Sequence, residues 1–175
     1  MSDLTPQELA RRAVEAFIRD GQVLETPEGM TGVLVERAGV FVTLRMRSGE
    51  LRGCIGTIQP TSENVASEII ANAISAATRD PRFLPVRPDE LSDLTYGVDV
   101  LSLPEPVSGI EDLDPSQYGV IIETLDGRRR GLLLPRIAGI DSAQEQWQAV
   151  HMKAGIRPDQ PVRVERFTVT RFGKD

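Results

Sequence analysis

Cysteine and histidine are almost absent from this chain, since Cys54 and His151 are the only residues of their kind. A single cysteine excludes a disulfide within the chain, which is typical of a protein from a reducing compartment. One cysteine and one histidine also cannot supply the four ligands of a structural zinc ion or the thiolates of an iron–sulfur cluster. We therefore expect no metal, no cofactor and a cytoplasmic location.

Long apolar runs and excess positive charge are missing as well. No apolar run approaches the roughly 20 residues of a membrane-spanning helix. The 175 residues include 20 basic and 26 acidic side chains, a net charge of −6. A generic nucleic-acid binder needs a cationic surface, because released counterions supply most of its non-specific affinity. The composition therefore argues against a membrane and against nucleic acid as partners.

What is present is an ordinary globular composition with three predicted helices. Hydrophobic residues make up 40% and charged residues 26% of the chain, and a chain of this length can bury a core without disulfides. Apolar residues at helical spacing, together with capping residues, indicate where the helices begin and end. The predicted limits are Thr5 and Gly21, then Thr61 or Ser62 and about Thr78, then Asp141 and Gly155.

Strands are predicted between these helices, mostly in hairpins. Two β-branched runs over residues 33–44 meet at Ala38-Gly39, and a second turn at residues 47–50 leads into the cysteine segment. Asp126-Gly127 is a strong hairpin signal. Residues 94–100 and 162–172 add two more strands, whereas the prolines in residues 80–86 exclude regular structure there. Strands in hairpins predict an α+β fold with a largely antiparallel sheet and helices packed on one face.

The segment Leu51-Arg52-Gly53-Cys54-Ile55-Gly56-Thr57 places the lone thiol between two glycines. Gly53 and Gly56 lack a Cβ, so a ligand could approach the main-chain N–H groups closely. Arg52 could favour the thiolate form of Cys54, provided that strand alternation keeps both side chains on one face. The alternative is a small buried cysteine in a strand with bulges. The residues alone favour this alternative.

Several blocks of the chain, including this segment, resemble the AMMECR family. The blocks follow the family's order and span most of the sequence, and the chain is similar to the stand-alone prokaryotic form, the AmmeMemoRadiSam system protein A. This resemblance implies a single domain over residues 1–175 with a larger and a smaller lobe, the boundary of which stays open. It also implies a genomic setting beside Memo-like and radical-SAM proteins, but no agreed reaction. The other blocks are Asp80-Pro81-Arg82-Phe83 with Pro85-Val86, Leu101-Ser102-Leu103-Pro104-Glu105-Pro106, Gly131-Leu132-Leu133-Leu134-Pro135 and Lys153-Ala154-Gly155-Ile156.

Because the cysteine segment is the family's hallmark, we take it as the candidate site. One hypothesis is a small-molecule or partner-binding site that acts with the Memo-like and radical-SAM proteins. The alternative is an enzyme that uses Cys54 as nucleophile or thiol acceptor, with Arg52 holding an anionic group. Whether the protein is an enzyme stays open. The binding residues would be Gly53, Ile55, Gly56, Thr57 and Arg82, the last from a block that we expect at the rim of the same site.

Other candidates are weaker. His151 could act as a base for Cys54, but a partly exposed surface histidine is the favoured interpretation. Arg128-Arg129-Arg130 could bind phosphate or carboxylate, although a solvated strand edge that discourages edge-to-edge pairing is favoured. Glu68 and Asp99 are candidate general bases that no spacing singles out.

Overall fold

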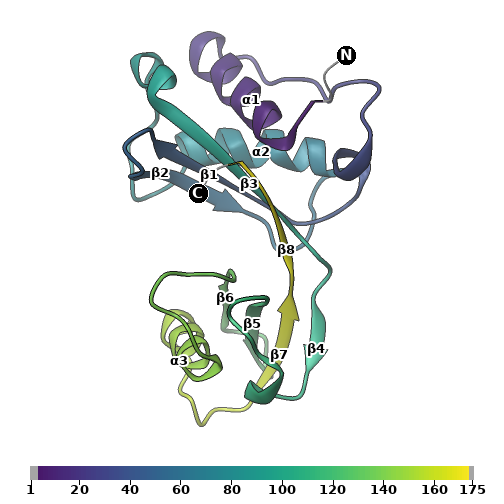
Figure 1. Ribbon diagram of the computed structural model, residues 1–175, viewed down its shortest axis with the longest axis vertical. Coiled ribbons are helices and arrows are strands. Elements are labelled where there is room, and N and C mark those ends of the chain that lie inside the picture. The colour runs from purple at the N-terminus through teal and green to yellow at the C-terminus, as the bar shows by residue number, and fades with distance from the viewer. Residues whose placement is uncertain (1–3, 174–175) are drawn as a thin grey trace. The chain divides into compact units, whose positions relative to one another are not determined.

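The protein divides into two compact units, which a computed structural model describes over residues 4–173. Unit 1 contains the chain up to Leu101 and again from Thr170, and unit 2 is Ser102–Val169. Each unit has its own four-stranded sheet, with α1 and α2 packed in unit 1 and α3 in unit 2 (Figure 1). The predicted α+β class is confirmed, and the antiparallel pairing that we expected in one sheet is distributed over two.

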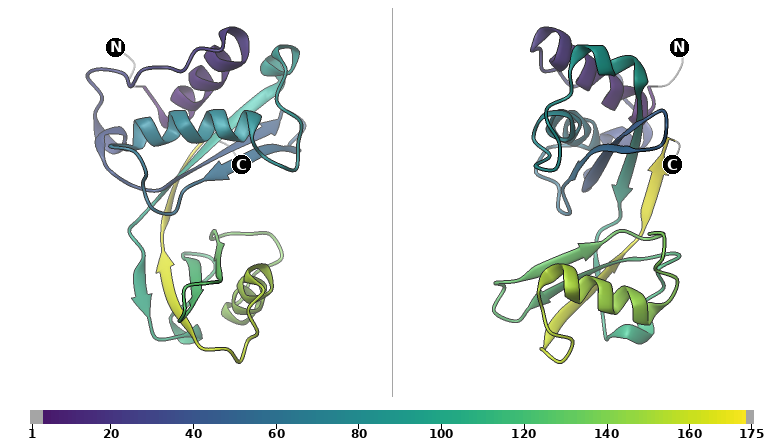
Figure 2. Two further views of the ribbon diagram at one scale, coloured as in Figure 1. Left: turned by 180° about the vertical axis from the view of Figure 1, so that it is seen from behind. Right: turned by 90° about the vertical axis from the view of Figure 1, so that its left-hand side faces the viewer.

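In unit 1 the strand order is β2-β1-β3-β8. Helix α2 packs on β1 and β2, and α1 packs on α2 and β3; Figure 2 shows α2 lying across the sheet. Every second residue of β1 is buried on the helix-covered face, so the alternation of this strand sets the core. The elements are α1 (Pro6–Asp20), the short 3₁₀ helix η1 (Gly32–Val35), β1 (Val40–Met46), β2 (Leu51–Gly56), α2 (Val65–Thr78), η2 (Pro88–Asp93), β3 (Leu94–Leu101) and β8 (Val169–Phe172).

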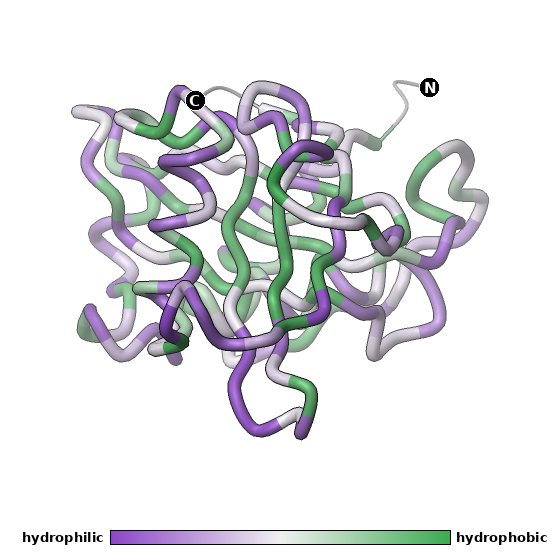
Figure 3. The backbone as a smooth tube through the Cα atoms, turned by 90° about the horizontal axis from the view of Figure 1, so that it is seen from below, coloured by the Kyte–Doolittle hydropathy of each residue, from purple (hydrophilic) through white to green (hydrophobic). Residues whose placement is uncertain are grey.

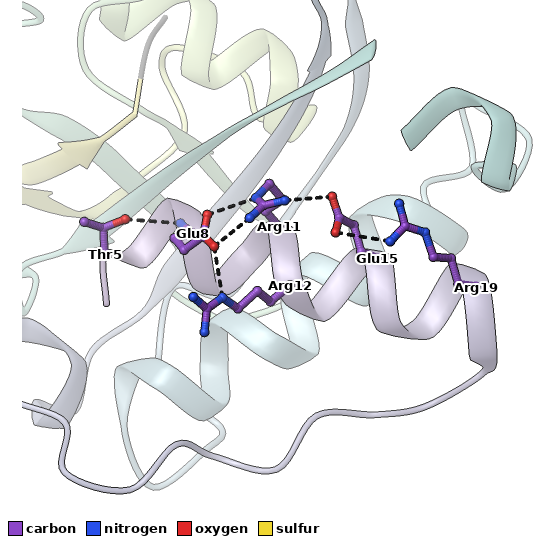
Figure 4. Close-up of polar contacts among 6 residues, drawn as sticks. All are labelled: Thr5, Glu8, Arg11, Arg12, Glu15 and Arg19. Carbon is purple, nitrogen blue, oxygen red and sulfur yellow. Dashed lines mark hydrogen bonds and ion pairs between the residues drawn. The ribbon is translucent and has the colours of Figure 1, made fainter. Parts of the chain in front are cut away.

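Helix α1 begins and ends at the predicted residues. The Thr5 hydroxyl accepts a hydrogen bond from the Glu8 N–H, and Gly21 adopts φ 66°, the left-handed conformation that closes a helix. Its outer face carries a chain of ion pairs (Figure 4), which lowers the pKa of Glu8 to about 2, chiefly through its hydrogen bond from Arg11. Such exposed pairs contribute little to stability.

The predicted hairpin over residues 33–44 is wrong in its first half. Residues Gly32–Val35 form the 3₁₀ helix η1, so the β-branched run does not become a strand. Gly39 does not lie in a turn either. A Cβ at this position would overlap the main-chain oxygens of Thr57 and Ile58. Close packing against that segment, and not hairpin geometry, explains the glycine. The observed hairpin is β1–β2, with its turn at the predicted residues 47–50.

Helix α2 ends at Thr78 as predicted but begins later than Thr61 or Ser62. Its cap is Asn64, the side chain of which accepts from the Ser67 N–H at 2.9 Å. Thr61 and Ser62 instead donate to the carboxylate of Glu68. The prediction failed because several hydroxyl and amide residues in a row can serve as a cap, and the tertiary contact decides among them.

In unit 2 the strand order is β4-β7-β5-β6, with α3 packed on β5 and β6. The predicted Asp126-Gly127 hairpin joins β5 to β6, and Gly127 has φ 70°. The single strand predicted over residues 162–172 is divided at Thr168, since β7 belongs to this sheet and β8 to that of unit 1. The elements are β4 (Glu105–Val107), η3 (Ile110–Asp112), β5 (Gly119–Thr124), β6 (Arg130–Leu133), α3 (Ala143–Ala154) and β7 (Val162–Phe167).

Helix α3 is capped at both ends and closely packed. Ser142, not the predicted Asp141, is its N-cap, in a reciprocal capping box with Glu145. Gly155 ends the helix in the left-handed conformation, as predicted. Figure 3 shows hydrophobic stretches along extended segments in the middle of the view. In the part of the chain described by the structure, no helix has the length and apolar character needed to cross a bilayer.

The block Lys153-Ala154-Gly155 has a structural role in this packing. The Lys153 ammonium donates to the Leu132 carbonyl of edge strand β6 at 2.8 Å. A Cβ on Gly131 would crowd the Ala154 side chain, so the helix approaches β6 where the strand has no side chain. Two of the blocks that carry the family resemblance thus meet at the contact between α3 and β6.

Candidate functional site

The cysteine segment forms β2, an edge strand of the unit 1 sheet. Gly53 faces α2, where a Cβ would overlap the carbonyl oxygen of Ala76, and a Cβ on Gly56 would overlap the ring of Phe41. Both glycines are therefore required for packing within the unit. We expected these glycines to let a ligand approach the main chain, but other parts of the same unit fill the space beside them.

A β-bulge in the β1–β2 ladder falls at Arg52. The register shifts between Leu44, which pairs with Gly53, and Arg45, which pairs with Leu51, so Arg52 has no partner in β1. The bulge breaks the alternation that was expected to align Arg52 with Cys54. The guanidinium of Arg52 instead donates to both carboxylate oxygens of Glu90 in η2, at 2.9 and 3.1 Å. The cation that was expected to hold an external anion is thus already paired.

Cys54 is half-buried and unpaired by disulfide. Its thiol lies 3.3 Å from the hydroxyl of Thr43, the residue opposite it in β1. Its main-chain N–H donates to the Asp80 carboxylate at 2.9 Å. That N–H is therefore occupied by a carboxylate of the same chain, so it does not form part of an open anion nest.

Asp80 joins the loop of residues 80–86 to the cysteine strand. This buried carboxylate also accepts from the Arg82 main chain and from two nitrogens of the Arg82 guanidinium, at 2.8 to 3.0 Å. The Arg82 hydrogen bond is the largest influence on the pKa of Asp80, and with the Cys54 N–H it outweighs burial and holds that pKa well below the usual range. The carboxylate is charged at neutral pH and fixes the loop against the edge of the sheet.

The two arginine-containing blocks meet at Phe83. The guanidinium carbon of Arg82 lies 5.5 Å from the centre of the Phe83 ring, and that of Arg52 lies 5.9 Å from it, both within the range of cation–π attraction. We call the five residues Arg52, Asp80, Arg82, Phe83 and Glu90 the Phe83 cluster. The structure therefore brings Arg52 and Arg82 to the same aromatic ring, although they are 30 positions apart in sequence.

Ile55 and Thr57 serve the interior of unit 1. Ile55 packs against the hydrophobic core. The Thr57 hydroxyl donates to Glu68 at 2.6 Å and lies 3.2 Å from the amide nitrogen of Asn72. Burial raises the pKa of Glu68, but its hydrogen bonds from Thr57 and from residues 61 and 62 outweigh burial and lower the pKa overall. Glu68 is thus the anchor of the chain segment that follows β2.

Four residues of the site were missed in the sequence: Thr43, Asp80, Phe83 and Glu90. Asp80 and Phe83 were visible only as parts of a block, although Asp-Pro is a local signal for a turn in which the carboxylate accepts from the main chain two residues on. Glu90 follows Arg87-Pro88 at the spacing of a helix-start residue and does accept from the Arg87 N–H at 2.8 Å. No local pattern predicts its pairing with Arg52, which depends on the fold.

His151 lies in the interior of unit 2, so the prediction of a partly exposed histidine is wrong. It is 1% exposed, and its Nδ1 lies 2.8 Å from the Trp147 carbonyl oxygen. The centres of the His151 and Trp147 rings are 4.3 Å apart. Helix α3 packs on β5 and β6, and His151 is one of its buried residues. Asp99, the other candidate base, is paired with Arg171 at 2.8 Å. Among residues 4–173, no three His, Cys, Asp or Glu side chains gather in a group that could hold a metal ion.

Comparison with known proteins gives a consistent family assignment. The family profile of AMMECR1 matches residues 7–174. A protein of Thermotoga maritima is 53% identical over 93% of this chain and 94% of its own length. A Clostridium acetobutylicum protein is 44% identical, but the match spans only 34% of its length. The crystal structure of an uncharacterised protein from Pyrococcus horikoshii superposes with a TM-score of 0.87 at 33% identity, over 97% of this chain and 90% of that one.

Proposed function

Because the chain belongs to the AMMECR1 family, we propose that its hallmark segment serves a binding function and not a catalytic one. The protein is a cytoplasmic binding subunit that docks a partner protein on the loop of residues 80–86, beside the cysteine strand β2. The partners are the Memo-like and radical-SAM proteins that the family resemblance implies. The observation that carries the proposal is the Phe83 cluster, which fixes this loop through side chains that are already paired.

The loop is held at both ends. Asp80 binds β2 through the Cys54 N–H, and the Val86 N–H donates to the Ala77 carbonyl at the end of α2, at 2.8 Å. Pro81 and Pro85 restrict the backbone between these two contacts. A loop that is ordered in advance loses little conformational entropy when it binds, and this property favours recognition of a partner.

The fixed loop presents an apolar side chain and a cationic one to solvent. Leu84 is 83% exposed, and the Arg82 side chain is 55% exposed although its guanidinium is paired with Asp80. Single exposed leucines are common and carry no meaning alone. Here the leucine stands next to an arginine on a pinned loop, and arginine beside an apolar anchor is a frequent composition of protein interfaces.

The environment of Cys54 is poor for nucleophilic catalysis. Within residues 4–173, the hydrogen-bonding neighbour of the thiol is the Thr43 hydroxyl, which is not a base at neutral pH. Arg52 and Arg82 are engaged by Glu90 and Asp80, so their charges are compensated. An enzyme would require these groups to act on an external substrate, whereas the observed pairs stabilise the loop.

Binding measurements with the Memo-like and radical-SAM proteins test the proposal. Leu84→Ser should weaken binding at least tenfold, because burial of a leucine contributes about 1.5–3 kcal/mol. Leu103→Ser is a matched control, since Leu103 is 80% exposed and lies in unit 2. Equal affinities for the wild type and both variants would refute docking on this loop.

The enzyme alternative makes a different prediction. If Cys54 is an activated nucleophile, its alkylation should be rapid even at pH 6, although the pKa of a model thiol is about 8.5. The alkylation should then slow in Arg52→Ala. That result would replace the binding proposal. The binding proposal would be supported by slow alkylation with the pH dependence of a model thiol, provided that Arg52→Ala leaves the rate unchanged.

A further inference from the structure

A second candidate site lies in unit 2 and is independent of the proposed function. A hollow of about 350 Å³ lies beside the β5–β6 turn and the segment that follows α3. Its volume is within the range of small-molecule sites, at the lower end. Its lining is entirely polar and consists of Thr124, Asp126, Arg128, Arg129, Arg157 and Gln160.

The charge of this hollow opposes the charge of the whole chain. Three of the six lining residues are arginines and one is an aspartate, in a protein with a net charge of −6. Two of these arginines form only long ion pairs with carboxylates. The Arg128 Nε lies 3.8 Å from an Asp126 carboxylate oxygen, and the Arg157 Nε lies 3.5 Å from an Asp159 carboxylate oxygen. Both pairs are exposed, so solvent screens them. In the Phe83 cluster, by contrast, each arginine makes two close hydrogen bonds to one carboxylate.

The wall of the hollow is ordered by its own contacts. The Thr124 hydroxyl donates to Asp126 at 2.6 Å and accepts from the Arg129 N–H at 3.1 Å, while the Arg128 N–H donates to Asp126 at 3.0 Å. The Arg129 guanidinium donates to the Gly155 carbonyl at the end of α3. One arginine is thus fixed between the hairpin and the helix, and the two others border the same space with solvent-exposed side chains.

We propose that this hollow binds a small molecule through a phosphate or pyrophosphate group. Guanidinium groups match phosphate oxygens in pairs, and charge-assisted bonds of this kind are the strong ones. Arg129 supplies a fixed cation, Arg128 and Arg157 close on the anion from two sides, and Gln160 offers a neutral donor. Because three arginines and one aspartate, Asp126, line the space, positive charge is in excess there, so a ligand with several anionic oxygens is favoured over a single carboxylate.

Isothermal titration of the full chain with inorganic pyrophosphate at low ionic strength tests this site. The wild type should bind one pyrophosphate per chain. Arg157→Gln should weaken binding roughly tenfold, the loss expected for one charge-assisted hydrogen bond. Among residues 4–173, the one ion pair of its side chain is an exposed pair with Asp159, so the variant should fold normally. Arg130→Gln is the matched control, because Arg130 faces Glu123 across the β5–β6 ladder and does not line the hollow. It should bind within about twofold of the wild type.

Three outcomes would overturn the proposal. The first is absence of saturable binding by the wild type. The second is an equal loss in Arg157→Gln and Arg130→Gln, which would indicate general charge attraction and not a site. The third is displacement of pyrophosphate by a short single-stranded oligonucleotide at lower concentration than by nucleoside triphosphate, which would identify the surface as a nucleic-acid contact.

Discussion

Replacing Asp80 with alanine tests the contact that holds the loop of residues 80–86 to the cysteine strand. The change removes the acceptor for the Cys54 N–H on the edge strand and the partner of the Arg82 guanidinium. We expect the fold to persist, because the core of unit 1 is not altered, but the free energy of unfolding to fall.

The size of this loss follows from the two contacts. A hydrogen bond to a charged acceptor contributes about 1.5–3 kcal/mol, and the Cys54 N–H would lose such a bond. The Arg82 side chain is 55% exposed, so its ion pair adds at most about 1 kcal/mol. Asp80→Ala should therefore cost about 2–4 kcal/mol. Asp80→Asn retains an oxygen that can accept from Cys54, and it should cost roughly half as much.

Urea denaturation followed by circular dichroism measures the loss. Trp147, the only tryptophan of the sequence, lies in unit 2, so its fluorescence reports separately on that unit. Asp89→Ala is the control, because both side chains of the Asp89–Arg87 ion pair are exposed. This variant should change the free energy of unfolding by less than about 0.5 kcal/mol. If Asp80→Ala costs no more than Asp89→Ala, the anchoring role of Asp80 is refuted.

The pH dependence of the same variants follows from the lowered pKa of Asp80. A carboxylate with a lowered pKa in the folded state stabilises the protein above its unfolded-state pKa, which is about 3.9 for aspartate. This contribution declines as the pH falls below that value toward the folded-state pKa. The difference between wild type and Asp80→Asn should thus be full at pH 7 and shrink progressively below about pH 4. A difference that grows on acidification would contradict the assignment.

Two further predictions concern packing. Gly53→Ala should cost about 1–3 kcal/mol or more in thermal unfolding, because its methyl group would overlap the Ala76 carbonyl oxygen; an unchanged melting temperature would refute the close approach of α2. Lys153→Met keeps the apolar part of the side chain but removes the hydrogen bond to the Leu132 carbonyl. We expect the free energy of unfolding to fall by about 1 kcal/mol, measured by urea denaturation and Trp147 fluorescence. A gain in stability would contradict a stabilising hydrogen bond between α3 and edge strand β6.

Local signals were sufficient for much of the fold. Thr5 with Pro6 at the start of α1, Gly21 at its end and Asp126-Gly127 in the hairpin each determine a conformation within a few residues, and each was predicted correctly. The run at residues 33–35 was assigned wrongly as a strand. Strand propensity there depends on a partner strand, and tertiary packing supplied none.

The candidate site shows the opposite balance. Most of its residues lie in recognisable blocks, but Glu90 does not, and the pairing of Arg52 with Glu90 and of Asp80 with Cys54 joins segments that are distant in sequence. The glycines of the segment indicated bulges, but the position of the bulge at Arg52, which decides which way that side chain is directed, follows only from the pairing of β2 with β1. The glycines of the segment were assigned to ligand access, whereas packing against α2 and Phe41 accounts for both.

Alkylation of Cys54 with and without a bound partner tests the central proposal most directly. Cys54 is the only cysteine, so a small alkylating reagent labels one site, and the label is read by mass spectrometry. We expect that a saturating concentration of a Memo-like or radical-SAM partner slows labelling at least fivefold, and that the Leu84→Ser variant needs a higher partner concentration for the same protection. An unchanged labelling rate at a partner concentration that saturates binding would show that docking occurs elsewhere and would contradict the account.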